Sequence, residues 1–179
     1  MLVVFRGLPG TGKTHLVRRI TGERPGFLVL SRDTIRVGMI PRPTFDEAEK
    51  ALVDDLVVSM AAFLLRRGRD VLIDGMALSS GARVRQFLDA AAAAGAPALV
   101  VECTCAEATA LERLARDRGG HPAGDRGEAL YEKVKARWEA VDAPVLRVQT
   151  DGAPAAALAA VMARIGDAGR TQGGTGDQA

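Results

Sequence analysis

Several features that would point to particular protein classes are scarce in this sequence. Only two cysteines occur, Cys103 and Cys105; they stand too close for an unstrained disulfide, and no other Cys or His pair nearby could complete a zinc site. They therefore predict reduced thiols, which suits a cytoplasmic protein. An excess of one charge is also missing. The 24 basic and 22 acidic residues leave a net charge of +2, so bulk electrostatics do not indicate a nucleic-acid-binding protein.

The sequence also lacks a membrane segment and internal repeats. Its longest apolar stretch, Leu56 to Leu65, is too short to cross a bilayer and carries charge on both sides. The chain begins directly with a strand-like apolar run, so no signal peptide is expected. With 179 residues, 47% of them hydrophobic and 26% charged, the composition predicts a single soluble domain with no membrane association.

The first fourteen residues carry the strongest motif. A short apolar run, residues 1–6, leads into an octapeptide that matches G-x-x-x-x-G-K-[ST] at every fixed position. Its residues are Gly7, Leu8, Pro9, Gly10, Thr11, Gly12, Lys13 and Thr14. The glycines let backbone N–H groups turn inward around a phosphate, while Lys13 reaches the β- and γ-phosphates and Thr14 offers a hydroxyl to Mg²⁺. Because a breaker-free, helix-compatible segment follows, this context favours a nucleoside-triphosphate site over a chance Gly-rich turn.

Apolar runs alternate with helical patterns along the rest of the chain. Strands are expected at residues 1–6, 27–30, 71–74, 98–103 and 145–149, and helices at 14–20, 34–39, 46–67, 82–94, 106–118, 127–140 and 154–165. Strands apolar enough to be buried on both faces predict an α/β protein with a parallel sheet between helical layers. Residues 1–165 form the predicted domain, and the Gly-rich, polar residues 166–179 are expected to be a disordered tail.

Two acidic residues are expected at the carboxyl ends of strands, the edge where such sheets bind ligands. Asp74 ends the run 71–74 in the manner of a Walker B acid, which holds Mg²⁺ directly or through water; the alternative is a turn acid before Gly75. Asp33 follows the second strand, where a carboxylate can accept the proton of an attacking hydroxyl or can cap the next helix. From spacing alone, both interpretations of Asp33 stay open.

Arginines precede a Gly-rich loop in the second half of the chain. Arg113, Arg116 and Arg118 belong to one expected helix, and the loop 119–127 follows it. A mobile lid at about residues 113–127 would close over a triphosphate and bring these guanidiniums to the transferring group. The alternative is a solvated basic helix face.

Together these motifs resemble the 5′-kinase domain of phage-type polynucleotide kinases. The resemblance rests on the loop Gly7–Thr14, on Pro25-Gly26-Phe27 before the second strand and on Ser31-Arg32-Asp33-x-x-Arg36. The wider group, which has an AAA-type P-loop kinase domain, also holds zeta-toxin-like, gluconate and antibiotic kinases. The resemblance implies a three-layer P-loop NTPase fold with a five-stranded parallel sheet of adenylate-kinase-like order, helices on both faces and a small lid.

The resemblance also implies roles for individual residues. Asp33 matches the general base that activates the acceptor hydroxyl, and Arg36 matches the arginine that grips the phosphate beside that hydroxyl. Lys13 and Thr14 match the phosphate and metal residues. Arg118, or less closely Arg116, matches the lid arginine that contacts the ATP phosphates. One departure concerns the acceptor site: Asp74 is followed by Gly-Met-Ala-Leu, where polynucleotide kinases carry Thr and Asn.

These observations predict an ATP- and Mg²⁺-dependent kinase whose acceptor is an alcohol group, with the 5′-OH of a polynucleotide or nucleotide preferred. The alternative is a small-molecule kinase acting on a sugar, nucleotide-sugar, nucleoside or antibiotic, which the modest net charge and the missing Thr-Asn pair favour. A nucleotide-dependent switch or ATPase is a third hypothesis, weakened by the lack of an appended domain for it to move. Nothing in the sequence predicts an oligomeric state.

Overall fold

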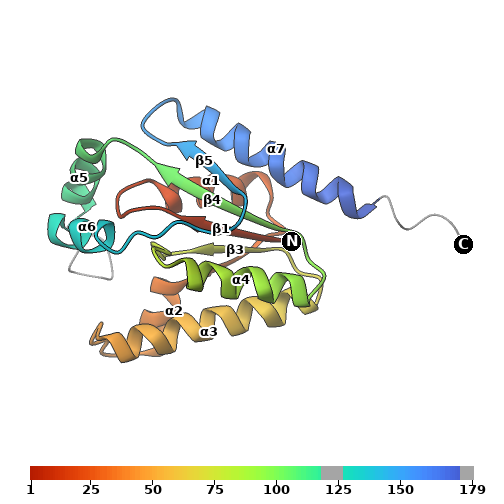
Figure 1. Ribbon diagram of the computed structural model, residues 1–179, viewed down its shortest axis with the longest axis horizontal. Helices are drawn as coiled ribbons and strands as arrows, with labels where there is room; N and C mark the ends of the chain where they lie inside the picture. Colours follow the sequence, from red (N-terminus) through yellow and green to blue (C-terminus); the bar gives the residue numbers. More distant parts are fainter. Residues whose placement is uncertain (118–126, 174–179) are drawn as a thin grey trace, which may run out of the picture.

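A five-stranded parallel sheet forms the centre of the protein (Figure 1). The computed structural model describes residues 1–117 and 127–173. Its strands are β1 (Leu2–Arg6), β2 (Leu28–Ser31), β3 (Val71–Asp74), β4 (Ala98–Thr104) and β5 (Val145–Gln149). Their order across the sheet is β2-β3-β1-β4-β5, and each neighbouring pair is parallel. This is the adenylate-kinase-like order, so the predicted fold class is confirmed.

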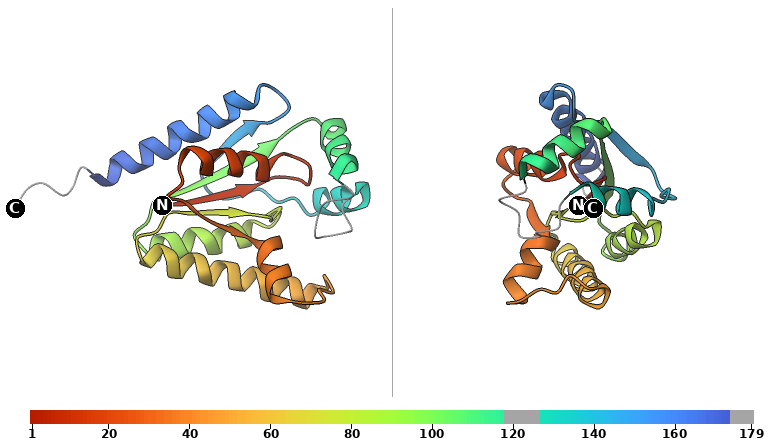
Figure 2. Two further views of the ribbon diagram at one scale, coloured as in Figure 1. Left: turned by 180° about the vertical axis from the view of Figure 1, so that it is seen from behind. Right: turned by 90° about the vertical axis from the view of Figure 1, so that its left-hand side faces the viewer.

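Helices cover both faces of the sheet and produce three layers (Figure 2). The helices within the described ranges are α1 (Lys13–Glu23), α2 (Arg32–Met39), α3 (Glu47–Arg66), α4 (Gly81–Ala93), α5 (Glu107–Arg116), α6 (Glu128–Lys135) and α7 (Pro154–Gly173). Helices α3 and α4 pack on one face and α1 and α7 on the other. Helices α5 and α6 lie beyond the carboxyl ends of the strands, at the left of Figure 1. None of the helices in these ranges combines the length and the apolar character needed to cross a membrane.

The central strand β1 is buried along its whole length. Leu2 and Val4 join the apolar core on the α3–α4 face, whereas Val3 and Phe5 join the core on the α1–α7 face. All four side chains are 0% exposed. Alternate residues of a strand point to opposite faces, so a strand covered on both sides needs the continuous apolar run that the sequence shows. This anchored strand delivers the loop that follows it to a fixed position.

Helix α6 is shorter than the sequence pattern predicted. It ends at Lys135, whereas the pattern had extended it to Ala140. The backbone N–H of Glu139 donates to the carbonyl of Ser79 at 2.9 Å, and the ring of Trp138 lies 4.1 Å from the Arg6 guanidinium. Because these contacts dock the segment against β1 and the start of α4, its backbone leaves the helical conformation.

Helix α7 is longer than predicted. It continues to Gly173, past the expected end at about Ile165, so the predicted disordered tail is wrong for residues 166–173. A glycine such as Gly166 costs a helix only about 1 kcal/mol, and no proline follows it in the sequence. Residues 174–179 lie outside the described part of the chain.

Candidate functional site

Two positions of the loop between β1 and α1 require glycine. Gly10 has a φ of +79°, and a Cβ atom on it would lie 2.4 Å from the carbonyl oxygen of Ala110 in α5. A Cβ atom on Gly7 would lie 2.5 Å from the carbonyl oxygen of Cys103 in β4. No side chain fits at such distances, so the glycines allow the loop to pack directly against neighbouring backbone. The loop is therefore seated between the end of β4 and α5.

Lys13 begins helix α1 and folds back across the loop. Its ammonium group donates to the carbonyl oxygens of Gly7 at 2.7 Å and Leu8 at 2.9 Å. This contact places a cation over the concave side of the loop, where the motif predicts the phosphates of a nucleotide.

Thr14 and Asp74 meet beside the same loop, although they are 60 residues apart in the sequence. The Thr14 hydroxyl donates to Asp74 Oδ1 at 3.1 Å, and Asp74 is 4% exposed. Hydroxyl and carboxylate oxygens are the ligands that Mg²⁺ prefers, and this ion takes one or two protein ligands together with substrate phosphates. The pair therefore fits a Mg²⁺ ion held next to a bound triphosphate.

Asp33 lies at the second position of α2. The N-cap of that helix is Ser31, whose Oγ accepts the backbone N–H of Thr34 at 3.4 Å, so the interpretation of Asp33 as the cap is wrong. Asp33 is 8% exposed, and Gly75 packs so closely that a Cβ atom there would lie 3.1 Å from its backbone nitrogen. In the sheet register Ser31 pairs with Asp74. The two predicted acids therefore follow and end adjacent strands at the same edge of the sheet.

Arg36 lies one helical turn beyond Asp33, but its guanidinium is enclosed. The residue is 2% exposed, its Nε lies 3.1 Å from Glu49 Oε1, and its guanidinium carbon lies 5.0 Å from the centre of the Phe45 ring. Glu49 also accepts the backbone N–H groups of Thr44 and Phe45, at 2.6 and 3.3 Å. Arg36 thus links α2 to the start of α3, a structural contact that the sequence pattern did not predict.

Arg113 joins three parts of the site, a specific role that its place in the sequence did not reveal. One of its Nη atoms donates to the Gly10 carbonyl and to Thr150 Oγ1, both at 3.3 Å, and the other donates to the Thr150 carbonyl at 2.7 Å. The Thr150 hydroxyl in turn donates to the Thr11 carbonyl at 2.9 Å. These bonds connect the phosphate loop, helix α5 and the segment after β5. A neutral threonine 139 residues from its loop partner carried no signal in the sequence.

Of the other two predicted lid arginines, the structure describes Arg116 but not Arg118. Arg116 ends α5, and its exposed side chain forms an ion pair with Glu112 at 2.6 Å within the same helix. Arg118 lies outside the described residues, as do residues 119–126 of the expected lid.

A cavity of about 570 Å³ opens beside the phosphate loop. Its described walls come from the loop, α1, α2, the segment after β3, α5, α6 and the start of α7. Its charged lining consists of the cations Lys13, Arg18, Arg32, Arg113 and Arg116 and the carboxylate Asp117. Such an excess of cations suits an anionic ligand. The lining does not include Asp33, Arg36 or Asp74.

Arg6 forms a buried contact that was not predicted from the sequence. Its side chain is 0% exposed, with Nε 3.2 Å from Glu102 Oε2 and Nη2 donating to the Glu139 carbonyl at 2.8 Å. Burial lowers the pKa of the Arg6 guanidinium, partly offset by Glu102. The sequence does place Arg6 and Glu102 in two expected strands, but it does not show that these strands are neighbours in the sheet. Because Arg6 directly precedes Gly7, it connects the segment after α6 to the base of the phosphate loop.

The two cysteines are free thiols, as predicted. Cys103 is 1% exposed, and burial raises its pKa to about 12. Burial also raises the pKa of Cys105. Both thiols are protonated at neutral pH and lack the thiolate that a nucleophile needs.

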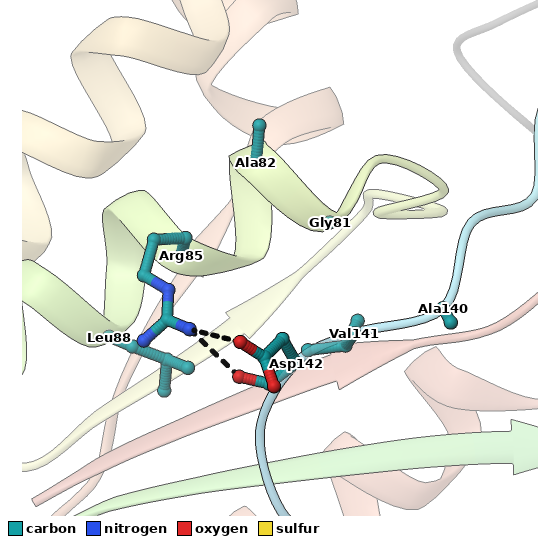
Figure 3. A pocket seen from close by; sticks show the side chains of 7 residues that line it. All are labelled: Gly81, Ala82, Arg85, Leu88, Ala140, Val141 and Asp142. Atoms are coloured by element: carbon teal, nitrogen blue, oxygen red, sulfur yellow. Dashed lines mark hydrogen bonds and ion pairs between the residues drawn. The ribbon is translucent and has the colours of Figure 1, made fainter.

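A second, smaller cavity of about 330 Å³ lies between α4 and the segment before β5 (Figure 3). Its charged groups, Arg85 and Asp142, already pair with each other, with the Arg85 guanidinium donating to the Asp142 carbonyl at 2.8 Å. The remaining lining is mostly apolar or backbone. This cavity offers no group for the chemistry of the phosphate loop.

The strand, the glycine loop, the helix after it and the contact of Thr14 with a strand-end acid are features of nucleotide-binding families, and a comparison of this sequence with family models finds one match. A family model described as an AAA domain matches residues 2–144. The chain belongs to the AAA-domain family. A search of curated proteins finds no match to this AAA-domain chain.

Solved structures resemble the AAA-domain chain over nearly its whole length. A putative kinase from Chloroflexus aurantiacus J-10-fl has a TM-score of 0.72 at 18% identity and covers 93% of this chain and 97% of its own. Kti12 of Chaetomium thermophilum, solved in complex with ADP-AlF3, has a TM-score of 0.69 at 20% identity over 94% and 98%. The APS kinase CysC of Mycobacterium tuberculosis, solved with AMPPNP and APS, has a TM-score of 0.65 at 22% identity over 92% and 96%. The chain therefore has the fold of P-loop kinases.

Proposed function

We propose that this chain is an ATP- and Mg²⁺-dependent kinase that transfers the γ-phosphate to a hydroxyl group. The observation that carries the proposal is the contact between Thr14 and Asp74 beside the loop, with Asp33 in the first turn of the helix that follows the adjacent strand. A phosphate loop and a metal site serve any nucleotide-dependent protein. A carboxylate on the neighbouring strand end adds a group that can act on an acceptor.

The donor half of the proposed site binds ATP. Backbone N–H groups of residues 7–14 and the Lys13 ammonium hold the β- and γ-phosphates, and Arg116 and Arg118 of the lid contribute positive charge to the transferring group. Thr14 and Asp74 would hold a Mg²⁺ ion, which would supply positive charge to the phosphates when bound. The hydrogen bonds of Arg113 keep α5 against the loop.

The acceptor half centres on Asp33. In the proposed reaction its carboxylate accepts the proton of the acceptor hydroxyl as the oxygen attacks the γ-phosphate, and ADP leaves with the electron pair of the broken bond. The cap of α2 is Ser31, so Asp33 is buried without serving as that cap. Its carboxylate lies 3.7 Å from the Nε atom of Arg32, a cation that lines the cavity, and this position supports a role in the reaction.

We infer a small hydroxyl compound, such as a sugar or nucleotide, as the acceptor. The cavity beside the phosphate loop has a volume of about 570 Å³, a size typical of small-molecule sites, which favours a small acceptor. Structural relatives that are named small-molecule kinases, the APS kinase and a gluconokinase from Sinorhizobium meliloti (TM-score 0.68 at 13% identity over 97% of this chain and 96% of its own), point the same way. The 5′-OH of a polynucleotide is the second candidate, favoured by the resemblance of Ser31-Arg32-Asp33-x-x-Arg36 to polynucleotide kinases.

The proposal is tested with labelled ATP and a panel of acceptors that includes 5′-OH oligonucleotides, nucleosides, nucleotides and sugar acids. Asp33→Asn is expected to lower kcat by roughly 10²- to 10⁴-fold while ATP affinity stays unchanged, because only proton acceptance is lost. Asp55→Asn is the matched control, since Asp55 is an exposed carboxylate of α3 that pairs with Arg83. Undiminished transfer by Asp33→Asn would overturn the assignment of the base. Hydrolysis of ATP with no labelled acceptor would instead favour a nucleotide switch.

A further inference from the structure

Arg32 occupies a position on the acceptor side that the proposed mechanism leaves unused. It is the first residue of α2, directly before Asp33, and its side chain is 24% exposed. Of the described cations that line the large cavity, it is the one contributed by α2. Lys13 and Arg18 come from α1, and Arg113 and Arg116 come from α5. Arg32 therefore contributes positive charge to the cavity from a different helix than the other cations.

The contacts of Arg32 are long for an arginine so enclosed. Its Nε lies 3.7 Å from Asp33 Oδ1 and its Nη1 lies 3.6 Å from Asp54 Oδ1. Both distances exceed the usual 2.7–3.2 Å of a hydrogen bond. Arg32 Nε and Asp54 Oδ1 are buried atoms with no hydrogen-bond partner among the described residues. A guanidinium presents five donors, and burying a charged group without hydrogen bonds is costly, so this group can gain from a further anionic partner.

Asp54 has the properties of a temporary partner for Arg32. Its carboxylate belongs to α3 and is mostly buried, and this burial raises its pKa, although the charges of Arg32, Arg83 and Arg36 oppose the rise. A carboxylate at 3.6 Å from the guanidinium costs little to replace with a better-matched anion. Bidentate contacts between arginine and carboxylate or phosphate provide such a match.

Arg36 is not available for the same task. Its guanidinium is buried between Glu49 and Phe45 and does not line the cavity. Withdrawing it would leave the Glu49 carboxylate buried without its cation and would separate α2 from the start of α3. Both arginines that flank Asp33 in the sequence have a buried nitrogen without a hydrogen-bond partner among the described residues, but of the two only Arg32 lines the cavity.

We propose that Arg32 determines acceptor specificity by binding an anionic group, phosphate or carboxylate, carried by the acceptor beside the hydroxyl that Asp33 activates. This assignment rests on the proposed kinase function and refines its substrate class. The anion takes the place of Asp54 on the guanidinium, and the neighbouring position of Asp33 then sets the hydroxyl against the γ-phosphate. A neutral acceptor lacks this anchor and binds weakly. In this proposal Arg32 takes the role that the resemblance gave to Arg36.

The first test compares acceptors that differ only in the anionic group. Nucleoside 3′-monophosphates are paired with nucleosides, and aldonic acids with their parent aldoses, so the two arms separate phosphate from carboxylate. Arg32→Gln is expected to raise KM for the anionic member of the preferred pair by roughly 10- to 100-fold, with little effect on the neutral member, because charge-assisted hydrogen bonds are lost. Arg32→Lys retains the charge and is expected to recover part of the loss. The matched control is Arg85→Gln, which removes an equal charge paired with Asp142 outside the large cavity.

The second test needs no turnover. The protein is loaded with a non-hydrolysable ATP analogue, so the phosphate loop is filled, and is titrated with inorganic phosphate by calorimetry. The wild type and Arg85→Gln are expected to bind phosphate roughly 10-fold or more tightly than Arg32→Gln. Equal binding by all three proteins, or equal loss of activity on anionic and neutral acceptors, would overturn the role of Arg32. A protein that binds ATP yet labels no acceptor, while phosphate binding still depends on Arg32, would refute the kinase proposal and leave the anion site standing.

Discussion

Gly10 packs so closely against the backbone of α5 that adding one methyl group there should destabilise the protein. In Gly10→Ala the new Cβ atom would meet the Ala110 carbonyl oxygen at 2.4 Å and the Ala110 carbonyl carbon at 2.9 Å, at a backbone φ of +79°. The left-handed conformation costs a non-glycine residue about 1–2 kcal/mol, and forcing an extra methyl into close-packed surroundings costs about 1–3 kcal/mol. The opposing atoms are helix backbone, so they cannot rotate away.

The expected loss is therefore about 2–5 kcal/mol of unfolding free energy, or a fall in Tm of about 4–20 °C. Relief by opening the loop would move the Gly10 carbonyl away from Arg113, so affinity for a fluorescent ATP analogue should fall as well. The matched control is Gly22→Ala. Gly22 lies in α1, where an added Cβ atom would point into open space, so the same substitution should raise stability by about 1 kcal/mol. A Gly10→Ala protein with the Tm and nucleotide affinity of the wild type would refute the argument that α5 fixes the loop.

Two further predictions concern groups away from the chemistry. Trp138 is the only tryptophan, and Trp138→Ala should lower the free energy of unfolding by about 1–2 kcal/mol because its stacking on Arg6 is lost. Trp138→Phe should recover most of this loss. Urea denaturation followed by circular dichroism measures both effects. Because the folded-state pKa of Cys103, about 12, lies above its unfolded value of about 8.5, the native state holds the proton longer, and stability should fall as pH rises from about 8.5 towards 12. Cys103→Ala should show a weaker dependence in that range, and an unchanged pH profile would contradict the assignment.

The sequence was informative where chemistry depends on local spacing. The motif Gly7–Thr14 fixes a strand, a loop and a helix start within a few residues, and the strand-end rule places Asp74 at the same edge. Those inferences need only the chain direction and the parallel sheet. The motif and the strand-end rule together place Thr14 and Asp74 near each other, as the structure shows.

Long-range partners explain what the sequence did not reveal. Arg36 has the spacing of an acceptor-binding residue, yet Glu49, on another helix, encloses it. The contact of Thr150 with the phosphate loop depends on where β5 lies in the sheet. The end of α6 is set by the docking of Trp138 on Arg6, because a buried cation at a strand end outweighs the helix propensity of residues 136–140.

The positions of the proposed site residues along the chain affect how acceptor specificity can change during evolution. The donor side is assembled from four separate places, the loop 7–14, Asp74, Arg113 and Thr150. The residues placed on the acceptor side instead fall within one uninterrupted stretch, from Ser31 to Asp54. On the proposed assignment, a single local replacement in the gene would change the acceptor site and leave the proposed ATP-binding residues unchanged. With such a division, one scaffold can acquire a new acceptor while the residues proposed to bind the phosphate donor stay the same.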